Sequence, residues 1–514
     1  MKTMNRQDTL TSIMSRSPTV LIIGGGINGV GTFRDLTLQG VDTLLIDRAD
    51  FCSGASAASS RMAHGGIRYL ENGEFRLVRE AVQERNRMIR NAPSLVQPLP
   101  TTIPIFKTFS GLLNAPLKFL GWLNKPSERG GLIIKVGLIF YDAFTGKNRA
   151  VPRHVFEGRR RALKKYPHLN RGIRYAATYY DGIILSPERL TMELLLDAEA
   201  EGKHARAINY VSLAGVNGDT VPLRDELTGS TFEIRPQLII NAAGPWIDRT
   251  NQSLGLSSQY IGPTKGSHLV LDNPDLREAI CDHEFFFENK DGRIVLIFPL
   301  FDKVMIGTSD LPIEDPDSAR CTEDEVDYFI GMVGRVFPGI QVSREQIIFR
   351  FSGVRPLAYT LAKNAGQITR DHHIQEDKLG TIPVYSLVGG KWTSFRAFSE
   401  QVTDQVLAFL SLPRKADTKS LPIGAGENAA ELKTDPHYTR GEIAGMAQRE
   451  KIVHLDDLLL RRTLLGYLGQ LTHPLVEGMA TALGEALGWD EMKKKAEVMR
   501  TLEILADRHG VKFV

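Results

Sequence analysis

The sequence has few cysteines, no long apolar run and no excess of one charge sign. Its three cysteines, Cys52, Cys281 and Cys321, are scattered, so neither a disulfide framework nor a structural zinc site is expected. No stretch of roughly 18 residues is both apolar and uncharged, which argues against a transmembrane helix. The 63 basic and 60 acidic residues nearly balance and give no indication of a nucleic-acid partner. Together these features favour a reducing, cytoplasmic compartment.

The chain is long enough for several domains. Its 514 residues, 42% of them hydrophobic, exceed what one compact core usually holds, so two or three domains are expected. Residues 1–17 are charged and lack the apolar core of a signal peptide, and we expect a flexible tail there. Residues 415–436 are polar and indicate a linker. The helical periodicity that follows predicts a small all-α domain over 412–514, which takes part in dimer contacts or braces the rest of the chain.

Residues 19–47 have the pattern of a dinucleotide-binding βαβ unit. A short β-branched run leads directly into a glycine turn and a helix-compatible stretch, and a second apolar run ends at Asp47, roughly 20 residues after the glycines. Gly24 permits the tight turn, Gly26 allows close approach to a pyrophosphate, and Gly29 allows the helix to pack on the strand. A glycine turn without a ligand is the alternative. The flanking strands and the terminal acid favour the nucleotide.

The positions around the turn are assigned by the same reasoning. Ile27 and Asn28 begin the helix, whose N-terminal N–H groups and dipole favour a phosphate anion. Asp47 can accept hydrogen bonds from the ribose of the adenosine half, and Arg48 follows it.

A second segment, residues 51–69, is rich in small and hydroxylated residues. Such a segment can pass close to a large planar ligand, and its hydroxyls can bind ribityl and pyrophosphate oxygens. A flexible serine-rich loop is the alternative. The candidate cofactor residues here are Ser59, Ser60, His64, Gly65 and Gly66.

Several strings along the chain match one known family in order. They are IIGGGINGVG at 22–31, SSRMAHGGIRYLENGEFRLVREA at 59–81, VGLIFYD at 136–142, NAAGPW at 241–246, KGSHLV at 265–270, IGTSD at 306–310, SGVRPL at 352–357, GGKWTSFR at 389–396 and HLDDLLLRRT at 454–463. On these strings the chain resembles the FAD-dependent glycerol-3-phosphate dehydrogenases, within the broader D-amino-acid-oxidase-like flavoproteins.

The resemblance implies a fold of the α/β (α+β) class around non-covalently bound FAD. A Rossmann-like FAD domain would be discontinuous, over about 18–101, 174–250 and 345–411, within an oxidoreductase unit of 18–411. The intervening segments would form an antiparallel-sheet substrate domain. The resemblance adds these cofactor residues: Ala243, Gly244, Trp246, Gly389, Gly390, Lys391, Trp392 and Thr393.

The GGKW segment can be interpreted physically as well. Residues 383–388 are strand-like, and a helix is predicted from Thr393 to Leu410, so the N–H groups of 391–394 should be exposed at its start. Together with Lys391 they would stabilise negative charge on the reduced flavin. Lys391 could instead be an ordinary solvated residue beside a helix cap.

The implied substrate, glycerol 3-phosphate, carries a dianionic group that requires fixed cations. Arg68, Tyr69, Arg355 and Lys391 lie in matched strings and are the expected phosphate-binding residues. Oxidation of the alcohol also needs a proton acceptor, and a histidine is suited to that role. We favour His64 as the base and His268 as a substrate-binding or polarising group, with the reverse assignment left open.

The electron acceptor is a quinone or oxygen, and we favour a quinone because oxygen-using relatives usually carry an extra insert. A quinone acceptor implies contact with the inner face of the cell membrane. Residues 103–140 combine apolar and basic side chains in a way that suits an interfacial helix, or alternatively a buried helix with solvated lysines. These residues include Leu112, Leu113, Leu117, Phe119, Leu120, Trp122 and Leu123 beside Lys107, Lys118 and Lys125. An amine oxidase and a non-catalytic FAD-binding module remain as alternative functions.

Overall fold

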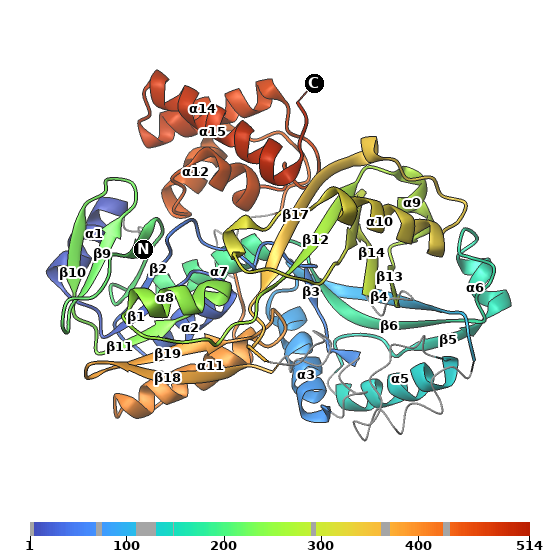
Figure 1. Cartoon of the computed structure of the whole chain (residues 1–514), viewed down its shortest axis with the longest axis horizontal. Helices are drawn as coiled ribbons and strands as arrows, with labels where there is room; N and C mark the ends of the chain where they lie inside the picture. Colours follow the sequence, from blue (N-terminus) through green and yellow to red (C-terminus); the bar gives the residue numbers. More distant parts are fainter. Residues whose placement is uncertain are drawn as a thin grey trace.

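The computed structural model describes residues 5–67, 74–108, 130–146, 149–288, 294–360, 371–424 and 432–513. Figure 1 shows two sheet-containing units side by side and a helical C-terminal unit above their junction. The arrangement confirms the mixed α/β class with a helical C-terminal domain.

The first unit is built on a mostly parallel sheet. Four of its six strands are fully buried, mainly apolar runs of four residues, as expected for strands covered on both faces. Within the described residues the order is β18 (His373–Leu379), β19 (Ile382–Val388), β11 (Leu238–Asn241), β1 (Val20–Ile23), β2 (Thr43–Ile46), β7 (Ala205–Ile208). The edge strand β18 is antiparallel to β19, and the other pairs are parallel.

Helices and a small sheet cover the two faces of this parallel sheet. Helix α2 (Ile27–Leu38) packs between α7 (Pro187–Ala200) and α11 (Phe395–Phe409). Helix α8 (Ile247–Ser253) contacts β11 and β19. A three-stranded sheet contributes to the opposite core, and its strands are β8 (Val211–Leu213), β9 (Val221–Asp225) and β10 (Thr231–Ile234).

The second unit is built on a larger, mostly antiparallel sheet, in which the pair β13 and β4 is parallel. The strand path in the described chain is β16 (Leu311–Pro312), β12 (Thr264–Leu271), β15 (Lys303–Gly307), β14 (Ile294–Leu300), β13 (Glu284–Glu288), β4 (Val96–Ile105), β6 (Tyr175–Ile184), β3 (Met62–Ala63), with β17 (Ile347–Arg355) beside β12 and β5 (Val155–Gly158) beside β6. Its helices are α3 (Phe75–Asn91), α5 (Gly131–Thr145), α6 (Arg159–Lys165), α9 (Pro274–Ala279) and α10 (Glu323–Val336).

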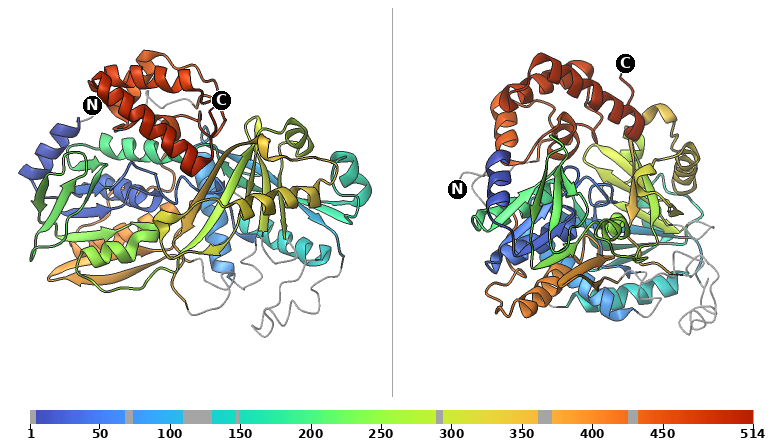
Figure 2. Two further views of the ribbon diagram at one scale, coloured as in Figure 1. Left: turned by 45° about the horizontal axis from the view of Figure 1, so that its top comes forward. Right: turned by 60° about the vertical axis from the view of Figure 1, so that its left-hand side comes forward.

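The C-terminal unit packs on the larger sheet. Its helices share a hydrophobic core with Val270, Phe298 and Phe349, which lie on β12, β14 and β17. The elements are α12 (Arg440–Arg449), α13 (Leu455–Asp457), the π-helical turn Leu458–Arg462, α14 (His473–Leu487) and α15 (Glu491–His509). Figure 2 shows this unit bridging the tops of the other two. Among the described residues, no helix has the length and apolarity needed to cross a bilayer.

Two expectations about chain organisation need correction. Residues 6–15 form helix α1 (Arg6–Ser15) where a flexible tail was expected, because Ile13 is buried and Arg6 donates to Asp225 at 2.6 Å. The proposed FAD-domain segments also contain strands of the other unit. Strands β4, β6 and β17 belong to the larger sheet, so the chain passes between the units within those segments.

Candidate cofactor and substrate site

The glycine turn joins β1 to α2 with contacts that exclude other residues at two positions. Gly24 has φ +111°, and a Cβ there would lie 2.6 Å from the carbonyl oxygen of Ala242. A Cβ at Gly29 would lie 1.9 Å from the oxygen of Gly24, so the helix rests directly on the turn. Gly26 is the N-cap of α2. The turn therefore has the tight shape that backbone binding of a pyrophosphate requires.

Asp47 supports the same turn from the end of β2. One carboxylate oxygen accepts from the Gly25 N–H at 2.7 Å, and the other accepts from the Ala49 N–H at 2.8 Å. Burial raises the pKa of Asp47 to about 6, against the opposing effect of these two bonds. Each oxygen keeps a further lone pair, so the carboxylate can shape the turn and accept a ribose hydroxyl as well.

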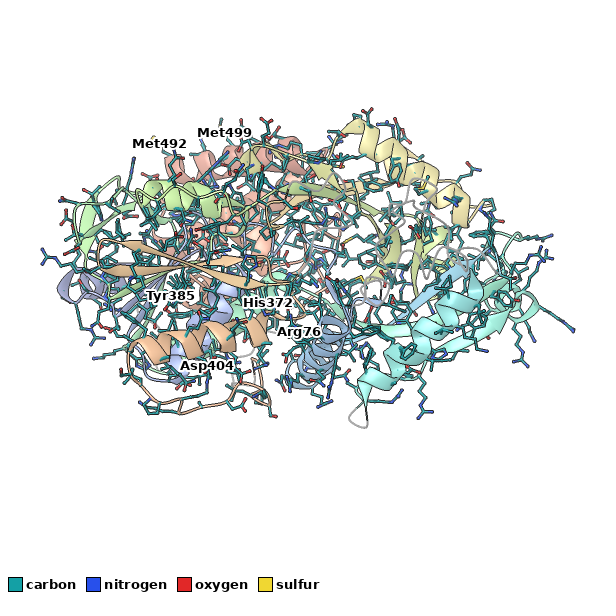
Figure 3. The ribbon with its side chains drawn as sticks, turned by 60° about the horizontal axis from the view of Figure 1, so that its bottom comes forward. Arg76, His372, Tyr385, Asp404, Met492 and Met499 are labelled. Carbon is teal, nitrogen blue, oxygen red and sulfur yellow. The ribbon has the colours of Figure 1, made fainter. Side chains whose placement is uncertain are left out.

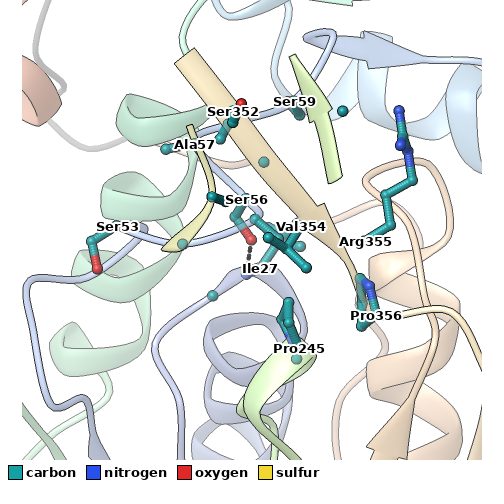
Figure 4. Close-up of a pocket in the computed structure, with 18 of the residues that line it drawn as sticks. Ile27, Ser53, Ser56, Ala57, Ser59, Pro245, Ser352, Val354, Arg355 and Pro356 are labelled. Atoms are coloured by element: carbon teal, nitrogen blue, oxygen red, sulfur yellow. Dashed lines mark hydrogen bonds between the residues drawn. The ribbon is translucent and has the colours of Figure 1, made fainter. Parts of the chain in front are cut away.

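A cavity of about 1750 Å³ extends from the glycine turn between the two sheets. Typical ligand pockets measure roughly 300–1,000 Å³, so this cavity has room for a dinucleotide and a second small molecule. Figure 4 shows the end of β17, from Ser352 to Arg355, and the following Pro356 running past the turn, where the Ile27 N–H donates to the hydroxyl of Ser56 at 2.9 Å. The cavity and the Cβ-free turn fit FAD.

Most of the predicted site residues line this one cavity. They are Gly24, Gly26, Ile27, Asn28, Asp47, Arg48, Ser59, Ser60, His64, Gly66, Ala243, Gly244, Trp246, His268, Arg355, Gly389, Gly390, Lys391, Trp392 and Thr393. Gly29 and Gly65 are not among the residues that line the cavity. Arg68 and Tyr69 fall outside the described residues, as do the apolar and basic side chains predicted over 109–129.

The backbone of His64 and Gly65 is held from two sides. The Thr393 hydroxyl accepts from the His64 N–H at 2.9 Å and donates to the His64 carbonyl at 3.0 Å. On the other side, Asp181 accepts from the Gly65 N–H at 3.0 Å, and the same carboxylate accepts from Arg85 at 3.2 Å. Arg85 is fully buried. This segment is therefore fixed before any ligand binds, as a preorganised catalytic site requires.

His268 is a buried, neutral histidine in the cavity wall. Its Nε2 lies 2.8 Å from the Ser60 hydroxyl, and its ring stacks on Phe351 with centroids 4.9 Å apart. Burial, together with the charges of Arg355 and Arg61, lowers its pKa to about 3. Its Nδ1 has no hydrogen-bond partner among the described residues. In this state His268 can donate or accept one hydrogen bond, but its protonated form is strongly disfavoured.

Arg355 ends β17 with its guanidinium already oriented. One terminal nitrogen donates to the Thr308 hydroxyl at 2.9 Å and to the Ser309 carbonyl at 3.0 Å, and the other donates to Asp310 at 3.3 Å. The side chain remains 25% exposed. This arginine therefore presents a positioned positive charge at the cavity wall.

The turn before α11 differs in detail from the prediction. Helix α11 begins at Phe395 rather than Thr393, and the Ser394 N–H donates to the Lys391 carbonyl. The N–H groups of 391–394 therefore belong to a turn that precedes the helix. The turn is attached to the glycine segment, because the Asn28 amide donates to the Gly389 carbonyl at 3.2 Å.

Other cavity residues were not singled out from the sequence. Ser56 caps the dinucleotide helix, Asp181 fixes Gly65, and Thr308 orients Arg355. Ser56 and Thr308 lie within or beside strings that were noticed, whereas nothing local distinguishes Asp181. The C-terminal unit also lines the cavity with Asp456, Leu460, Arg461, Tyr467, Arg500, Ile504, Arg508 and His509.

An ion pair joins helix α3 to one residue of the cavity wall. Arg76 pairs with Asp371, which lines the cavity and precedes β18. Figure 3 shows Arg76 and the neighbouring His372 between α3 and the parallel sheet. Glu80, one turn along α3 from Arg76, has a raised pKa. Burial is the main cause, and the charges of Asp371 and Glu84 add to it, whereas the charge of Arg76 opposes it.

Comparison with known proteins shows the family of the chain. Residues 19–404 match the profile of the family described as FAD dependent oxidoreductase, and residues 403–494 match the C-terminal domain of alpha-glycerophosphate oxidase. A glycerol-3-phosphate dehydrogenase from Synechocystis sp. is 35% identical, covering 86% of this chain and 79% of the relative. D-erythritol 1-phosphate dehydrogenase from Brucella abortus is 30% identical, covering 86% of this chain and 84% of the relative.

A solved structure has the same fold along nearly the whole chain. The glycerol-3-phosphate dehydrogenase from Bacillus halodurans complexed with FAD aligns with a TM-score of 0.73 at 21% identity, covering 98% of this chain and 97% of that one. The family profile matches well over half of the residues, in the region that forms the glycine turn and the cavity. The chain therefore belongs to the family of FAD-dependent oxidoreductases, with FAD as its cofactor.

Proposed function

We propose that this protein oxidises sn-glycerol 3-phosphate to dihydroxyacetone phosphate. The observation that carries the proposal is a single cavity whose lining includes the dinucleotide turn together with Arg355, Lys391 and the histidines His64 and His268. Bound FAD supplies a flavin ring that accepts hydride from the substrate carbon. Relatives named glycerol-3-phosphate dehydrogenase, at up to 35% identity, support this substrate.

The chain's own residues have distinct roles in this proposal. Arg355 and Lys391, with Arg68 and Tyr69, bind the phosphate dianion. His64 takes the proton of the C2 hydroxyl, and its backbone is held for that purpose by Thr393. His268 is the weaker candidate for the base, because its own burial, and then the charge of Arg355, lower its pKa and oppose protonation. It is suited instead to a hydrogen bond with the substrate.

An anaerobic titration tests the substrate. Purified holoprotein is mixed with glycerol 3-phosphate, glycerol or D-erythritol 1-phosphate, and the visible absorption of oxidised flavin is followed. We expect bleaching by glycerol 3-phosphate and none by glycerol, because glycerol lacks the dianionic anchor. Faster bleaching by the erythritol compound would transfer the proposal to a longer polyol phosphate. Bleaching by none of them would refute it.

We further propose a quinone as the electron acceptor, with oxygen as the alternative. The substrate-reduced protein is mixed with a soluble short-chain quinone or with air-saturated buffer, and flavin reoxidation is timed. Fast reoxidation by the quinone and slow reoxidation by oxygen are expected. The opposite order would make the protein an oxidase.

The described part of the predicted interfacial segment, together with a neighbouring basic helix, supports contact with a membrane surface. Helix α5 exposes Leu132, Val136, Ile139 and Phe140, at spacings that place them on one face. Helix α6, at the same end of the molecule in Figure 1, carries five exposed cations, Arg159, Arg160, Arg161, Lys164 and Lys165. An apolar face beside basic residues is typical of proteins that bind anionic bilayers.

Co-sedimentation with anionic vesicles tests this surface. Ile139→Glu should release the protein from the vesicles, whereas Leu412→Glu, at a position with similar exposure in another part of the chain, should not. Equal binding by both variants would exclude α5 from the contact. The expected homodimer is checked separately, by light scattering of the purified protein without vesicles.

A further inference from the structure

One carboxylate of the larger-sheet unit bonds to three residues of the parallel-sheet unit. Asp317 lies in the short turn Pro316–Ser318, between β16 and α10. It accepts from Arg48 at 2.6 Å, from the indole N–H of Trp246 at 3.0 Å and from Arg249 at 3.0 Å. We call these four residues the Asp317 clasp. The clasp connects the two units across the cavity between them.

All four residues of the clasp line the cavity beside the dinucleotide turn. Arg48 directly follows Asp47, and its guanidinium lies 4.9 Å from the centre of the Trp246 ring. The Trp246 ring packs on the segment that follows β2, since a Cβ at Gly54 would lie 3.1 Å from it. The clasp therefore lies beside the place where Asp47 would bind the adenosine ribose. It does not include Arg355 or Lys391, the expected phosphate-binding residues.

We propose that Asp317 is a cofactor-retention residue, which slows the dissociation of FAD by holding the two units together over the dinucleotide end of the cavity. FAD bound without a covalent bond leaves only if the cavity opens. The clasp is a direct ionic contact that such opening breaks. Asp317 acts through Arg48, Trp246 and Arg249, so it is a positioning residue. The proposal rests on FAD binding and is independent of the substrate.

The exposure of the clasp determines its expected strength. The Arg48, Arg249 and Asp317 side chains are 53%, 49% and 45% exposed, so each ion pair is partly screened by solvent. Three donors on one carboxylate form a network, which contributes more than an isolated pair. We expect its loss to accelerate FAD release roughly tenfold, equivalent to about 1.4 kcal/mol. Salt should weaken the same contacts, because exposed charges are screened within about 10 Å at 0.1 M ionic strength.

FAD release from the holoprotein tests the proposal. Flavin fluorescence is followed after dilution, at low salt and at about 0.5 M NaCl. Asp317→Asn should release FAD faster at low salt and respond little to added salt, while the wild type should release faster as salt rises. The matched control is Asp302→Asn, which removes another exposed ion-paired aspartate, in the turn between β14 and β15. This control should behave as the wild type does.

Two further variants show whether the effect passes through the clasp. Trp246→Phe replaces the indole by a smaller aromatic ring that has no N–H donor, and should give part of the Asp317→Asn effect. Combining Asp317→Asn with Arg249→Gln should add less than the sum of the single changes, because both remove the bond between Arg249 and Asp317. Arg249→Gln also removes the 2.8 Å bond from Arg249 to Asp315, so some of its effect should remain in the double variant. Identical release rates and salt responses for Asp317→Asn and Asp302→Asn would overturn the proposal. Failure of glycerol 3-phosphate to bleach the flavin would leave it unaffected.

Discussion

Replacement of Arg355 by Ala should weaken substrate capture while leaving FAD bound. The guanidinium is held by Thr308, Ser309 and Asp310 before substrate arrives, so little ordering of this side chain opposes phosphate binding. A hydrogen bond to a charged group contributes roughly 1.5–3 kcal/mol, and each 1.4 kcal/mol corresponds to about tenfold. We therefore expect kcat/KM to fall by about 10- to 150-fold. The upper part of this range is favoured because the Asp310 carboxylate would remain beside the phosphate after the charge of Arg355 is removed.

The assay is anaerobic stopped-flow reduction of the flavin over a range of glycerol 3-phosphate concentrations. The effect should appear as a higher apparent Kd for substrate, with the same FAD content per protein. The matched control is Arg350→Ala, which removes an arginine from the same strand, where it pairs with Glu323. If Arg355→Ala and Arg350→Ala bind substrate equally well, Arg355 has no part in phosphate binding.

Three other changes test separate parts of the site. Gly29→Ala should give a folded but colourless protein, since its Cβ would lie 1.9 Å from the Gly24 oxygen, and recovery of a yellow protein would contradict this. Thr393→Val should slow flavin reduction roughly tenfold without changing the substrate Kd, because it frees the His64 backbone, and an unchanged rate would remove Thr393 from the argument. Burial raises the pKa of Glu284 to about 8, so the folded protein loses stability as pH rises from near 4.5 through 8. Glu284→Gln should therefore raise Tm at pH 9 relative to the wild type and change it little at pH 5. A shift of equal size at both pH values would show that ionisation of Glu284 is not the cause.

The glycine turn was predictable because its determinants are contiguous. The turn, the helix and the second strand together span under thirty residues, and the steric reasons for Gly24 and Gly29 involve neighbours within the same unit. The positive φ of Gly24 and the contact of Gly29 with Gly24 both arise inside the turn, so the spacing of the glycines was enough to predict them. The close approach of Ala242 to Gly24 comes from β11 and could not be predicted in this way. The helix after Gly390 was predicted for the same reason, with an error of two residues at its start. Such an error is expected where a tight turn precedes a helix, since helix ends depend on local capping.

The N-terminal helix was missed because its stability comes from distant residues. Residues 6–15 have little apolar character of their own, and only Thr9 and Ile13 are buried. The helix is held by Arg6, which bonds to Asp225, and by Arg206, which donates to the carbonyl oxygens of Ser12 and Arg16. Those partners lie about two hundred residues away. No pattern within the segment can indicate them.

The domain boundaries failed for a related reason. Strand β17 carries Arg355 at its end and pairs with β12 in the larger sheet. The next strands along the chain, β18 and β19, belong to the parallel sheet, and the SGVRPL string was therefore assigned to the FAD domain with them. A strand's own residues specify its faces but not its neighbours. The assignment of β4, β6 and β17 to the larger sheet depends on pairings between strands far apart in sequence. Motif order along the chain cannot supply that information.

The C-terminal unit shows most clearly how the three parts depend on one another. Asp50, three positions after Asp47, is fully buried and accepts from Arg461 at 2.6 Å and from Arg462 at 2.9 Å. Although burial opposes ionisation, these two arginines hold the pKa of Asp50 below its usual value. Breaking a buried ion pair of this kind costs roughly 3–5 kcal/mol. The loop after β2, which carries Asp47, the proposed ribose-binding acid, is therefore fixed by the C-terminal unit. This contact gives the HLDDLLLRRT string a structural role although none of its residues is proposed to be catalytic.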